Sequence, residues 1–146
     1  MKASDELIKA LKGFEGLRLE SYTDSGDVWT IGYGHTFGVK KGQKITKEQA
    51  EALLRGDLLP CEKAVTGMGV WAQGQFDALL DFTFNLGIDA LMKSTLLRKI
   101  RLNASKEEIT NEFMKWNKIR VKGKLVASKW QTARRTWEAK RYFEQF

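Results

Sequence analysis

The spacing of the apolar residues changes along this chain, and those changes constrain the fold more than any other feature. Residues 7–14 carry apolar side chains at helical spacing. From Leu17 to His35, apolar and polar residues alternate on either side of a turn at residues 24–27, which is typical of a β-hairpin. After residue 46 the helical spacing returns. One helix, a small antiparallel sheet and then many helices together predict an α+β fold.

Short local signals place the individual elements. A third strand is expected within Val39–Ile45, and Pro60 suits the first position of a helix. One expected helix is capped by Ser4 and ended by Gly13 and Gly16, and another is opened by the Thr46–Gln49 capping box. Two more are expected over Gln75–Leu86 and over Thr95–Arg101, the latter capped by Ser94. The last two run from the Ser105–Glu108 capping box to about Trp116 and over Trp130–Phe146. Everything after the hairpin region is therefore expected to be helical.

Length and composition exclude several classes of protein. The 146 residues fit a single domain, because domains are typically about 100–150 residues long. One cysteine, Cys61, and one histidine, His35, exclude an intrachain disulfide framework and a two-histidine metal site. No apolar run is long enough to span a membrane, and Asp5 and Glu6 stand where a signal peptide would be apolar. We expect a soluble protein made in the cytoplasm without signal peptide, metal or cofactor, with Cys61 as a small packed side chain.

The positive charge is concentrated in the second half of the chain. Of the formal net charge of +7, none lies in residues 1–73, where ten basic residues balance ten acidic ones. Residues 74–146 carry fifteen basic and eight acidic residues. A basic half indicates a polyanionic partner, such as nucleic acid, anionic lipid or an acidic wall polymer, or else a solubilising surface. Charge alone does not choose among them.

Three polar residues between Phe14 and Thr36 form the candidate catalytic group. Glu15 ends the first helix, Asp24 lies in the hairpin turn, and Thr30 follows in the next strand. Apolar neighbours such as Phe14 favour the protonated form of Glu15, whereas the solvated turn favours ionised Asp24. One protonated and one ionised carboxyl group is the arrangement that cleaves glycosidic bonds. A helix-end Glu and a turn Asp without catalytic roles remain the alternative.

Five motifs in order along the chain resemble one enzyme family. They are Glu15-Gly16-Leu17-Arg18-Leu19 with Tyr22, Asp24, Gly26 and Trp29-Thr30-Ile31-Gly32-Tyr33-Gly34-His35-Thr36, then Gln75-Phe76-Asp77-Ala78-Leu79, Phe84-Asn85-Leu86-Gly87, Ser94-Thr95-Leu96-Leu97, and Arg134-Arg135 with Glu138. This pattern resembles the phage lysozyme family, glycoside hydrolase family 24. The resemblance implies that Glu15, Asp24 and Thr30 are the catalytic triad. The chain departs from many relatives at Lys129-Trp130, where those relatives have Gly-Leu, so the role of Arg134 and Arg135 stays open.

The resemblance also implies a lysozyme-like fold with two lobes and a cleft between them. We expect a single domain, 1–146, with a small sheet lobe at about residues 13–59 and a larger helical lobe at about residues 1–12 and 60–146. The substrate-binding candidates are His35, Thr36, Phe84, Asn85 and Thr95. Three of them have structural alternatives: His35 as a hydrogen bond between the hairpin and the helices, Phe84 as a core residue, and Thr95 as part of a helix cap.

The function implied is that of an endolysin. Such an enzyme hydrolyses the β-1,4 bond between N-acetylmuramic acid and N-acetylglucosamine in peptidoglycan, without cofactor. Glu15 is expected to act as the general acid, while Asp24 and Thr30 position water, which favours an inverting reaction. The expected protein is a monomer that binds anionic peptidoglycan and no nucleic acid. It is not expected to insert stably into membranes, and it leaves the host cytoplasm after a separate holin has permeabilised the membrane. A basic nucleic-acid-binding module and an inactive wall-binding relative are the alternatives.

Overall fold

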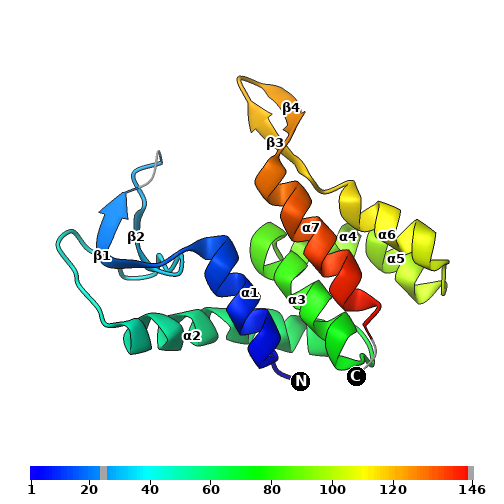
Figure 1. Ribbon diagram of the computed structural model, residues 1–146, viewed down its shortest axis with the longest axis horizontal. Helices are drawn as coiled ribbons and strands as arrows, with labels where there is room; N and C mark the ends of the chain where they lie inside the picture. Colours follow the sequence, from blue (N-terminus) through cyan, green and yellow to red (C-terminus); the bar gives the residue numbers. More distant parts are fainter. Residues whose placement is uncertain (24–25, 145–146) are drawn as a thin grey trace. The chain divides into compact units, whose positions relative to one another are not determined.

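The computed structural model describes residues 1–23 and 26–144, which form helices and two small antiparallel sheets (Figure 1). This confirms the α+β class. The chain divides into two compact units, one made of Asp5–Pro60 and the other of Met1–Ser4 with Cys61–Phe146.

The first unit begins with helix α1 (Asp5–Glu15), which buries Leu7, Ile8 and Leu11 on one side. These positions repeat at helical spacing, as the sequence predicts. The helix ends because Gly16 takes a left-handed conformation, with φ of 71°. Its N–H donates to the carbonyl oxygen of Lys12 at 3.1 Å, which satisfies one of the unpaired carbonyls at the helix end.

Strands β1 (Arg18–Thr23) and β2 (Trp29–Gly32) form the predicted hairpin, with Tyr22 opposite Thr30. The prediction of a third strand within Val39–Ile45 is wrong. In that segment one isolated bridge forms, between Lys44 and Glu20. Gly38 and Gly42 both have positive φ, so the chain turns twice there and runs beside β1 only briefly.

Helix α2 (Lys47–Thr66) continues through Pro60, so the prediction that Pro60 begins a helix is wrong. A proline inside a helix removes one backbone hydrogen bond and costs about 3 kcal/mol. Two features offset this cost. The Thr46–Gln49 capping box is formed as predicted, with bonds of 2.8 and 3.1 Å. One face of the helix is also buried, through Ala50, Leu54, Leu58 and Val65.

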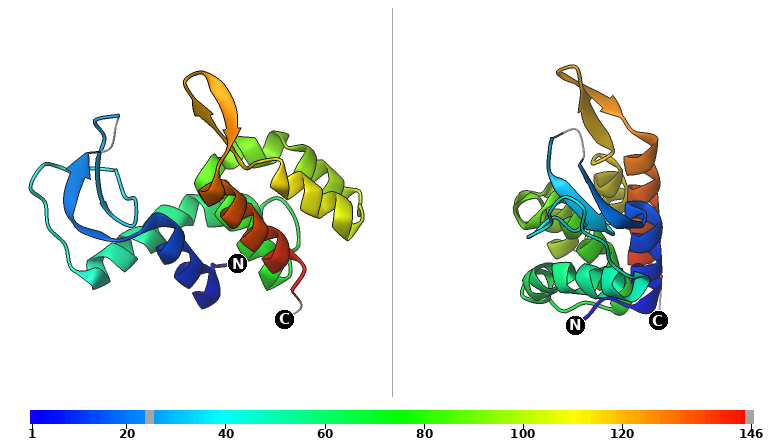
Figure 2. Two further views of the ribbon diagram at one scale, coloured as in Figure 1. Left: turned by 45° about the horizontal axis from the view of Figure 1, so that its top comes forward. Right: turned by 90° about the vertical axis from the view of Figure 1, so that its left-hand side faces the viewer.

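The second unit is built mainly of helices. Their bounds are α3 (Gln73–Leu86), α4 (Ile88–Lys93), α5 (Thr95–Arg101), α6 (Lys106–Met114) and α7 (Lys129–Tyr142). The caps predicted at Ser94 and Ser105 are present, because each hydroxyl accepts from the backbone N–H three residues later. α3 supplies much of the core through Phe76, Leu79, Leu80 and Phe82, and it packs along α7 (Figures 1 and 2).

Two buried ion pairs join α3 to α7. Arg134 donates to both carboxylate oxygens of Asp81, at 3.0 and 2.9 Å. Arg141 donates twice to Asp77, at 3.0 and 2.7 Å. The acids stand four residues apart on α3, and therefore on one face of that helix. Asp77 also accepts from the backbone N–H of Ser4 at 3.2 Å and from the Ser4 hydroxyl, so the first residues of the chain are held by the second unit.

The expectation that the chain is helical throughout its second half is wrong between α6 and α7. Strands β3 (Lys118–Val121) and β4 (Lys124–Ala127) pair as an antiparallel hairpin there. Its two-residue turn, Lys122-Gly123, has positive φ at both positions, 51° and 78°. Such turns match the right-handed twist of paired strands. The glycine and the alternating side chains beside it were the sequence signal for this hairpin.

Candidate active site

Glu15 is the last residue of α1, so the chain turns away immediately after it at Gly16. Its carboxyl group lies beside Gly34. A β-carbon added to Gly34 would stand 3.3 Å from Oε2 of Glu15. Gly34 also has φ of 83°, a conformation that side chains disfavour. The glycine therefore leaves room for the carboxyl group against the backbone that follows β2.

Thr30 lies in β2 and is 6% exposed. Its hydroxyl donates to the carbonyl oxygen of Val28 at 3.1 Å. With its proton engaged in this way, the Thr30 oxygen retains lone pairs that can accept a hydrogen bond. The site can thus offer an acceptor to a water molecule at this position.

Asp24, the third residue of the predicted triad, lies outside the described residues, as does Ser25. The flanking strands are described: Thr23 ends β1 and pairs with Trp29 at the start of β2. The catalytic assignment of Asp24 stays a prediction.

His35 closes a tight turn after β2, where it exchanges two backbone hydrogen bonds of 2.9 Å with Ile31. Both nitrogens of its ring are engaged. Nδ1 lies 2.9 Å from the carboxylate of Asp57 in α2, and Nε2 lies 2.9 Å from the carbonyl oxygen of Phe37. Both partners are hydrogen-bond acceptors. This geometry favours the structural interpretation of His35 as the link between the hairpin and a helix. Thr36, which follows, is exposed.

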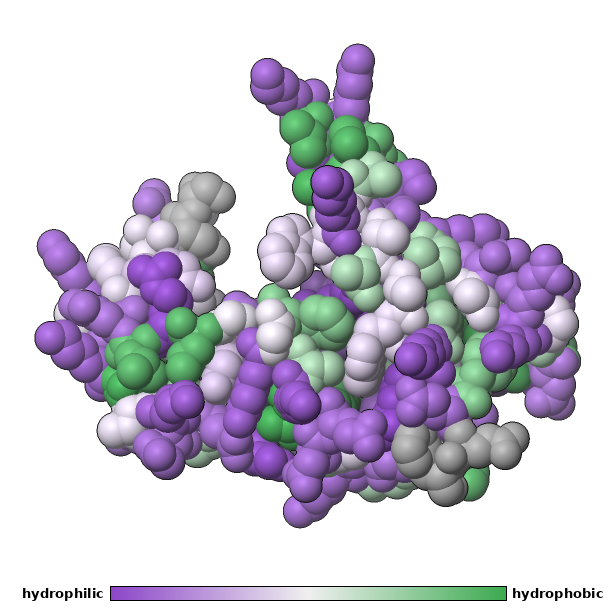
Figure 3. Space-filling model, in the orientation of Figure 1, coloured by the Kyte–Doolittle hydropathy of each residue, from purple (hydrophilic) through white to green (hydrophobic). Residues whose placement is uncertain are grey.

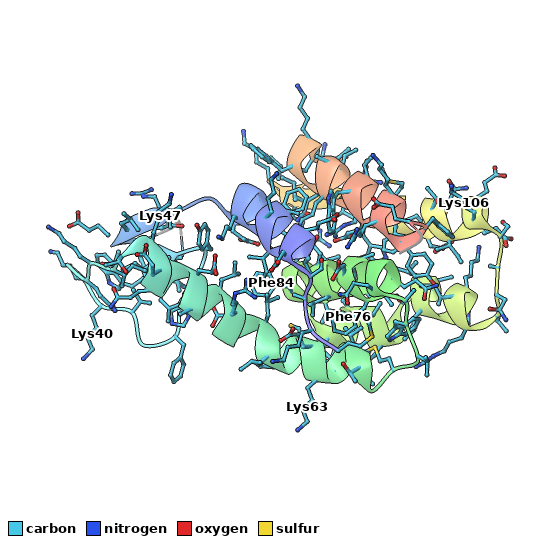
Figure 4. The ribbon with its side chains drawn as sticks, turned by 60° about the horizontal axis from the view of Figure 1, so that its bottom comes forward. Lys40, Lys47, Lys63, Phe76, Phe84 and Lys106 are labelled. Carbon is cyan, nitrogen blue, oxygen red and sulfur yellow. The ribbon has the colours of Figure 1, made fainter. Side chains whose placement is uncertain are left out.

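The remaining candidates belong to the second unit. Phe84, which is labelled in Figure 4, lies near the C-terminal end of α3. Asn85 follows it, and both residues are half-buried. Thr95 is the first residue of α5, directly after the cap residue Ser94. The structure therefore places Glu15, Thr30 and His35 in one unit and Phe84, Asn85 and Thr95 in the other.

The paired arginines have internal partners. Arg135 is fully buried and donates from Nη2 to Oδ1 of Asn85 at 2.8 Å, and from Nη1 to the carbonyl oxygen of Trp116 at 3.4 Å. It also stacks over the Phe82 ring, 5.2 Å from the ring centre. Arg135 thereby fixes the amide of Asn85, which leaves the amide nitrogen of Asn85 as the group that can face a ligand. The sequence alone leaves this role open.

Glu138 lies within the same buried cluster. Its Oε2 accepts from Nη2 of Arg135 at 2.9 Å. Its Oε1 is 2.8 Å from Nε of Arg135, but these two atoms are not aligned for a hydrogen bond. Burial, followed by the nearby carboxyl of Asp81, raises the pKa of Glu138 well above its usual value, against the opposing effect of Arg135 and Arg134.

A charged depression of about 280 Å³ lies beside α1 and the start of α2. It is lined by Lys12, Tyr33, Lys47, Glu48 and Glu51. Lys12 pairs with Glu51, and hydrogen bonds from Lys12 and then Arg55 lower the pKa of Glu51. One base and one acid of this depression, Lys12 and Glu51, are therefore paired with each other.

Within residues 1–23 and 26–144, no three histidine, cysteine or acidic side chains gather as metal ligands. In the same part of the chain, every helix is too short or too polar to cross a lipid bilayer.

Comparison with known proteins identifies the class and then the family. An endolysin from Acyrthosiphon pisum secondary endosymbiont phage 1 is 40% identical over 126 residues, which cover 85% of this chain and 86% of the relative. The endolysin from Escherichia coli O157:H7 phage FAHEc1 superposes with a TM-score of 0.89 at 40% identity, covering 99% of this chain and 94% of that one. The muramidase domain of SpmX from Asticaccaulis excentricus gives 0.91 at 35% identity, covering 99% of each chain.

These relatives and the fold define a lysozyme, an enzyme of the hydrolase class. The phage lysozyme family model matches residues 12–138, and the chain belongs to that family. The family resemblance and the lysozyme-like fold predicted from the motifs are therefore confirmed.

Proposed function

We propose that this lysozyme is a muramidase that hydrolyses the β-1,4 bond between N-acetylmuramic acid and N-acetylglucosamine, and that it serves as an endolysin in host lysis. The placement of Glu15 carries this proposal. Its carboxyl group ends a helix and lies against the glycine backbone at Gly34, in the same compact unit as the buried hydroxyl of Thr30. The peptidoglycan substrate follows from membership of the lysozyme family.

Glu15 acts as the general acid that protonates the oxygen of the leaving sugar. A water molecule attacks the anomeric carbon from the opposite face. It donates one hydrogen bond to Asp24, which takes the proton, and one to the Thr30 oxygen. The Thr30 hydroxyl suits this part because its own proton is directed to Val28. With both hydrogens of the water engaged, a lone pair is left for the anomeric carbon, and the reaction inverts its configuration.

The sugar-binding residues divide into direct and indirect contributors. His35 holds the turn that contains Gly34, because both of its ring nitrogens bond within the protein. Thr36 is exposed beside it and contacts substrate directly. In the second unit, Asn85 donates from its amide nitrogen, the half-buried Phe84 provides an apolar wall, and Thr95 adds a hydroxyl.

The same proposal covers partners and location. The enzyme acts as a monomer without cofactor, is made in the host cytoplasm, and reaches the wall through a membrane lesion made by a separate holin. Two of the three relatives reported above are named endolysins, which supports this sequence of events. The basic second half of the chain favours the anionic wall and raises the rate of encounter with it.

Digestion of purified peptidoglycan tests the proposal. Mass spectrometry of the released fragments should show reducing N-acetylmuramic acid ends. Products lighter by one water would identify transglycosylation instead. A parallel gel-shift assay in moderate salt tests the alternative of a nucleic-acid-binding module, and a specific shift without peptidoglycan cleavage would contradict the muramidase assignment.

A further inference from the structure

The β3–β4 hairpin stands outside the helical packing of its unit. In both orientations of Figure 2 it extends from the start of α7 as a separate arm. All eight strand residues are exposed. Four of them are large aliphatic residues: Ile119, Val121, Leu125 and Val126 are 42%, 44%, 61% and 46% exposed. Single exposed apolar residues are normal on a protein surface, but four within one short hairpin form a patch.

Cations alternate with these aliphatic residues. Residues 118–127 contain four basic side chains, Lys118, Arg120, Lys122 and Lys124, and no acidic one. Figure 3 shows the resulting mixture of hydrophobic and hydrophilic surface over the arm.

The strand register sorts these side chains onto two faces. Ile119 pairs with Val126 and Val121 pairs with Lys124, so these four share one face. Three of the four are aliphatic, and the lysine stands next to the turn. On the opposite face, Arg120 pairs with Leu125. The hairpin is therefore amphipathic, with cations around its tip.

The base of the hairpin is firmly attached. The Ser128 N–H donates to the Asn117 carbonyl oxygen at 2.8 Å and closes the base. The amide of Asn117 donates to the Thr132 hydroxyl in α7 at 3.1 Å. The Trp116 carbonyl accepts from buried Arg135. The arm is thus held in its extended form before any partner binds, which lowers the entropy cost of binding.

We propose that the β3–β4 hairpin binds the surface of an anionic phospholipid bilayer. The cations lie at the lipid phosphates, and the face with Ile119, Val121 and Val126 enters the boundary between headgroups and acyl chains. An anionic polysaccharide would account for the cations, but only an apolar medium accounts for the aliphatic face. This binding is peripheral and requires no spanning helix.

Co-sedimentation with vesicles of phosphatidylcholine, with and without phosphatidylglycerol, tests the proposal on the full chain. Binding is expected only with phosphatidylglycerol present. The triple variant I119T/V121T/V126T removes the aliphatic face, keeps every charge and keeps a β-branched side chain at all three positions. It should bind anionic vesicles at least about tenfold more weakly. Val70→Thr is the matched control, because Val70 is 100% exposed and lies far from the hairpin in the sequence. It should bind as the parent chain does.

A second pair of variants separates charge from insertion. K122Q/K124Q should weaken binding roughly fivefold for each lysine. K40Q/K41Q, which removes two exposed lysines outside the hairpin, should have little effect. Peptidoglycan digestion by I119T/V121T/V126T should stay at the parent level, so this test does not depend on the catalytic assignment.

Three results would overturn the proposal. The first is no binding of the parent chain to anionic vesicles, and the second is unchanged vesicle binding by the threonine variant while the glutamine variant no longer binds. The third is a loss of vesicle binding by Val70→Thr equal to that of the threonine variant. The second result would assign the arm to polyanions in general. Circular dichroism checks that the variants fold. If the triple variant does not, Val126→Thr carries the test, since Val126 is the most exposed of the three residues on the inserting face.

Discussion

Oε2 of Glu15 lies 3.3 Å from the point where Gly34 would carry a β-carbon. A methyl group there is closer than most van der Waals contacts allow, and the backbone conformation disfavours any side chain. The glycine between Tyr33 and His35 therefore leaves space for the proposed general acid. Gly34 therefore contributes to the chemistry through the space that it leaves beside Glu15.

Gly34→Ala should reduce peptidoglycan hydrolysis by about tenfold or more, because the methyl group displaces the Glu15 carboxyl from its position. Gly38→Ala is the matched control. Gly38 also has positive φ, 71°, but a β-carbon there meets no atom within 4 Å. Both variants should lose about 1–2 kcal/mol of stability from backbone strain. Equal activities for the two variants would contradict a specific contact with Glu15.

Glu15→Gln should lower hydrolysis by about 10²–10⁴-fold or more, since it removes the proton donor and keeps the shape of the side chain. Turbidity of permeabilised cells and thermal unfolding together measure the effect. Glu20→Gln, an exposed change in β1, should leave activity unchanged. Near-normal activity of Glu15→Gln would exclude Glu15 as the acid.

Thr30→Val should reduce activity by about 10²-fold, because valine keeps the volume but cannot accept a hydrogen bond from water. Thr30→Ser should retain much more activity. The loss of the bond to Val28 should also destabilise the valine variant, by about 1–3 kcal/mol. Unfolding measurements are needed to separate the two effects.

The stereochemistry of the reaction is a separate prediction. Proton NMR of the first reducing sugar formed should show the α-anomer before mutarotation, as direct attack by water requires. A β-anomer would indicate retention, with Asp24 as nucleophile and Thr30 as a residue that orients it.

Glu138→Gln should change how stability depends on pH. The folded pKa of Glu138 is raised above the usual 4.5, so the stabilisation that the neutral form provides is complete below that value. It is lost as pH rises toward the folded pKa, because the unfolded chain releases its proton first. Glutamine remains neutral at every pH, so the free energy of unfolding of the variant should decline less as pH rises above 4.5. Denaturation in urea across pH measures this. Exposed Glu107→Gln is the control, and matching curves for both variants would contradict a raised pKa of Glu138.

Elements with strong local signals were predictable from the sequence. The bounds of α5 agree with the expectation, and the capping box of Ser105 and Glu108 correctly marks the start of α6. Each of these signals acts within one turn of chain. Pro60 shows the limit of local rules, because the buried face of α2 outweighs the preference of one residue.

The ion pairs between α3 and α7 could not be predicted in this way. Asp81 and Arg134 are 53 residues apart, and no spacing pattern connects them. The sequence does contain half of the signal, since Asp77 and Asp81 are acids within an apolar helix and therefore need buried partners. In the candidate site, sequence motifs identified Glu15 and Thr30, which lie in one unit. They gave no indication that Arg135 fixes Asn85, because that bond depends on the packing of the two helices.

The second unit is not a continuous stretch of chain, and this matters for anyone dividing the gene. A fragment starting at Cys61 would lack Ser4, and with it two hydrogen-bond donors to Asp77. It would also lack Ala3, whose N–H bonds Glu62 at 2.7 Å. In such a fragment the buried carboxylates of Asp77 and Glu62 would lose these hydrogen-bond donors. A circular permutant that opens the chain within 61–146 and joins the original ends keeps residues 1–4 attached, so it preserves these bonds. Rearranged versions of this enzyme should therefore keep the first four residues attached to the second unit, because Ala3 and Ser4 bond Glu62 and Asp77 there.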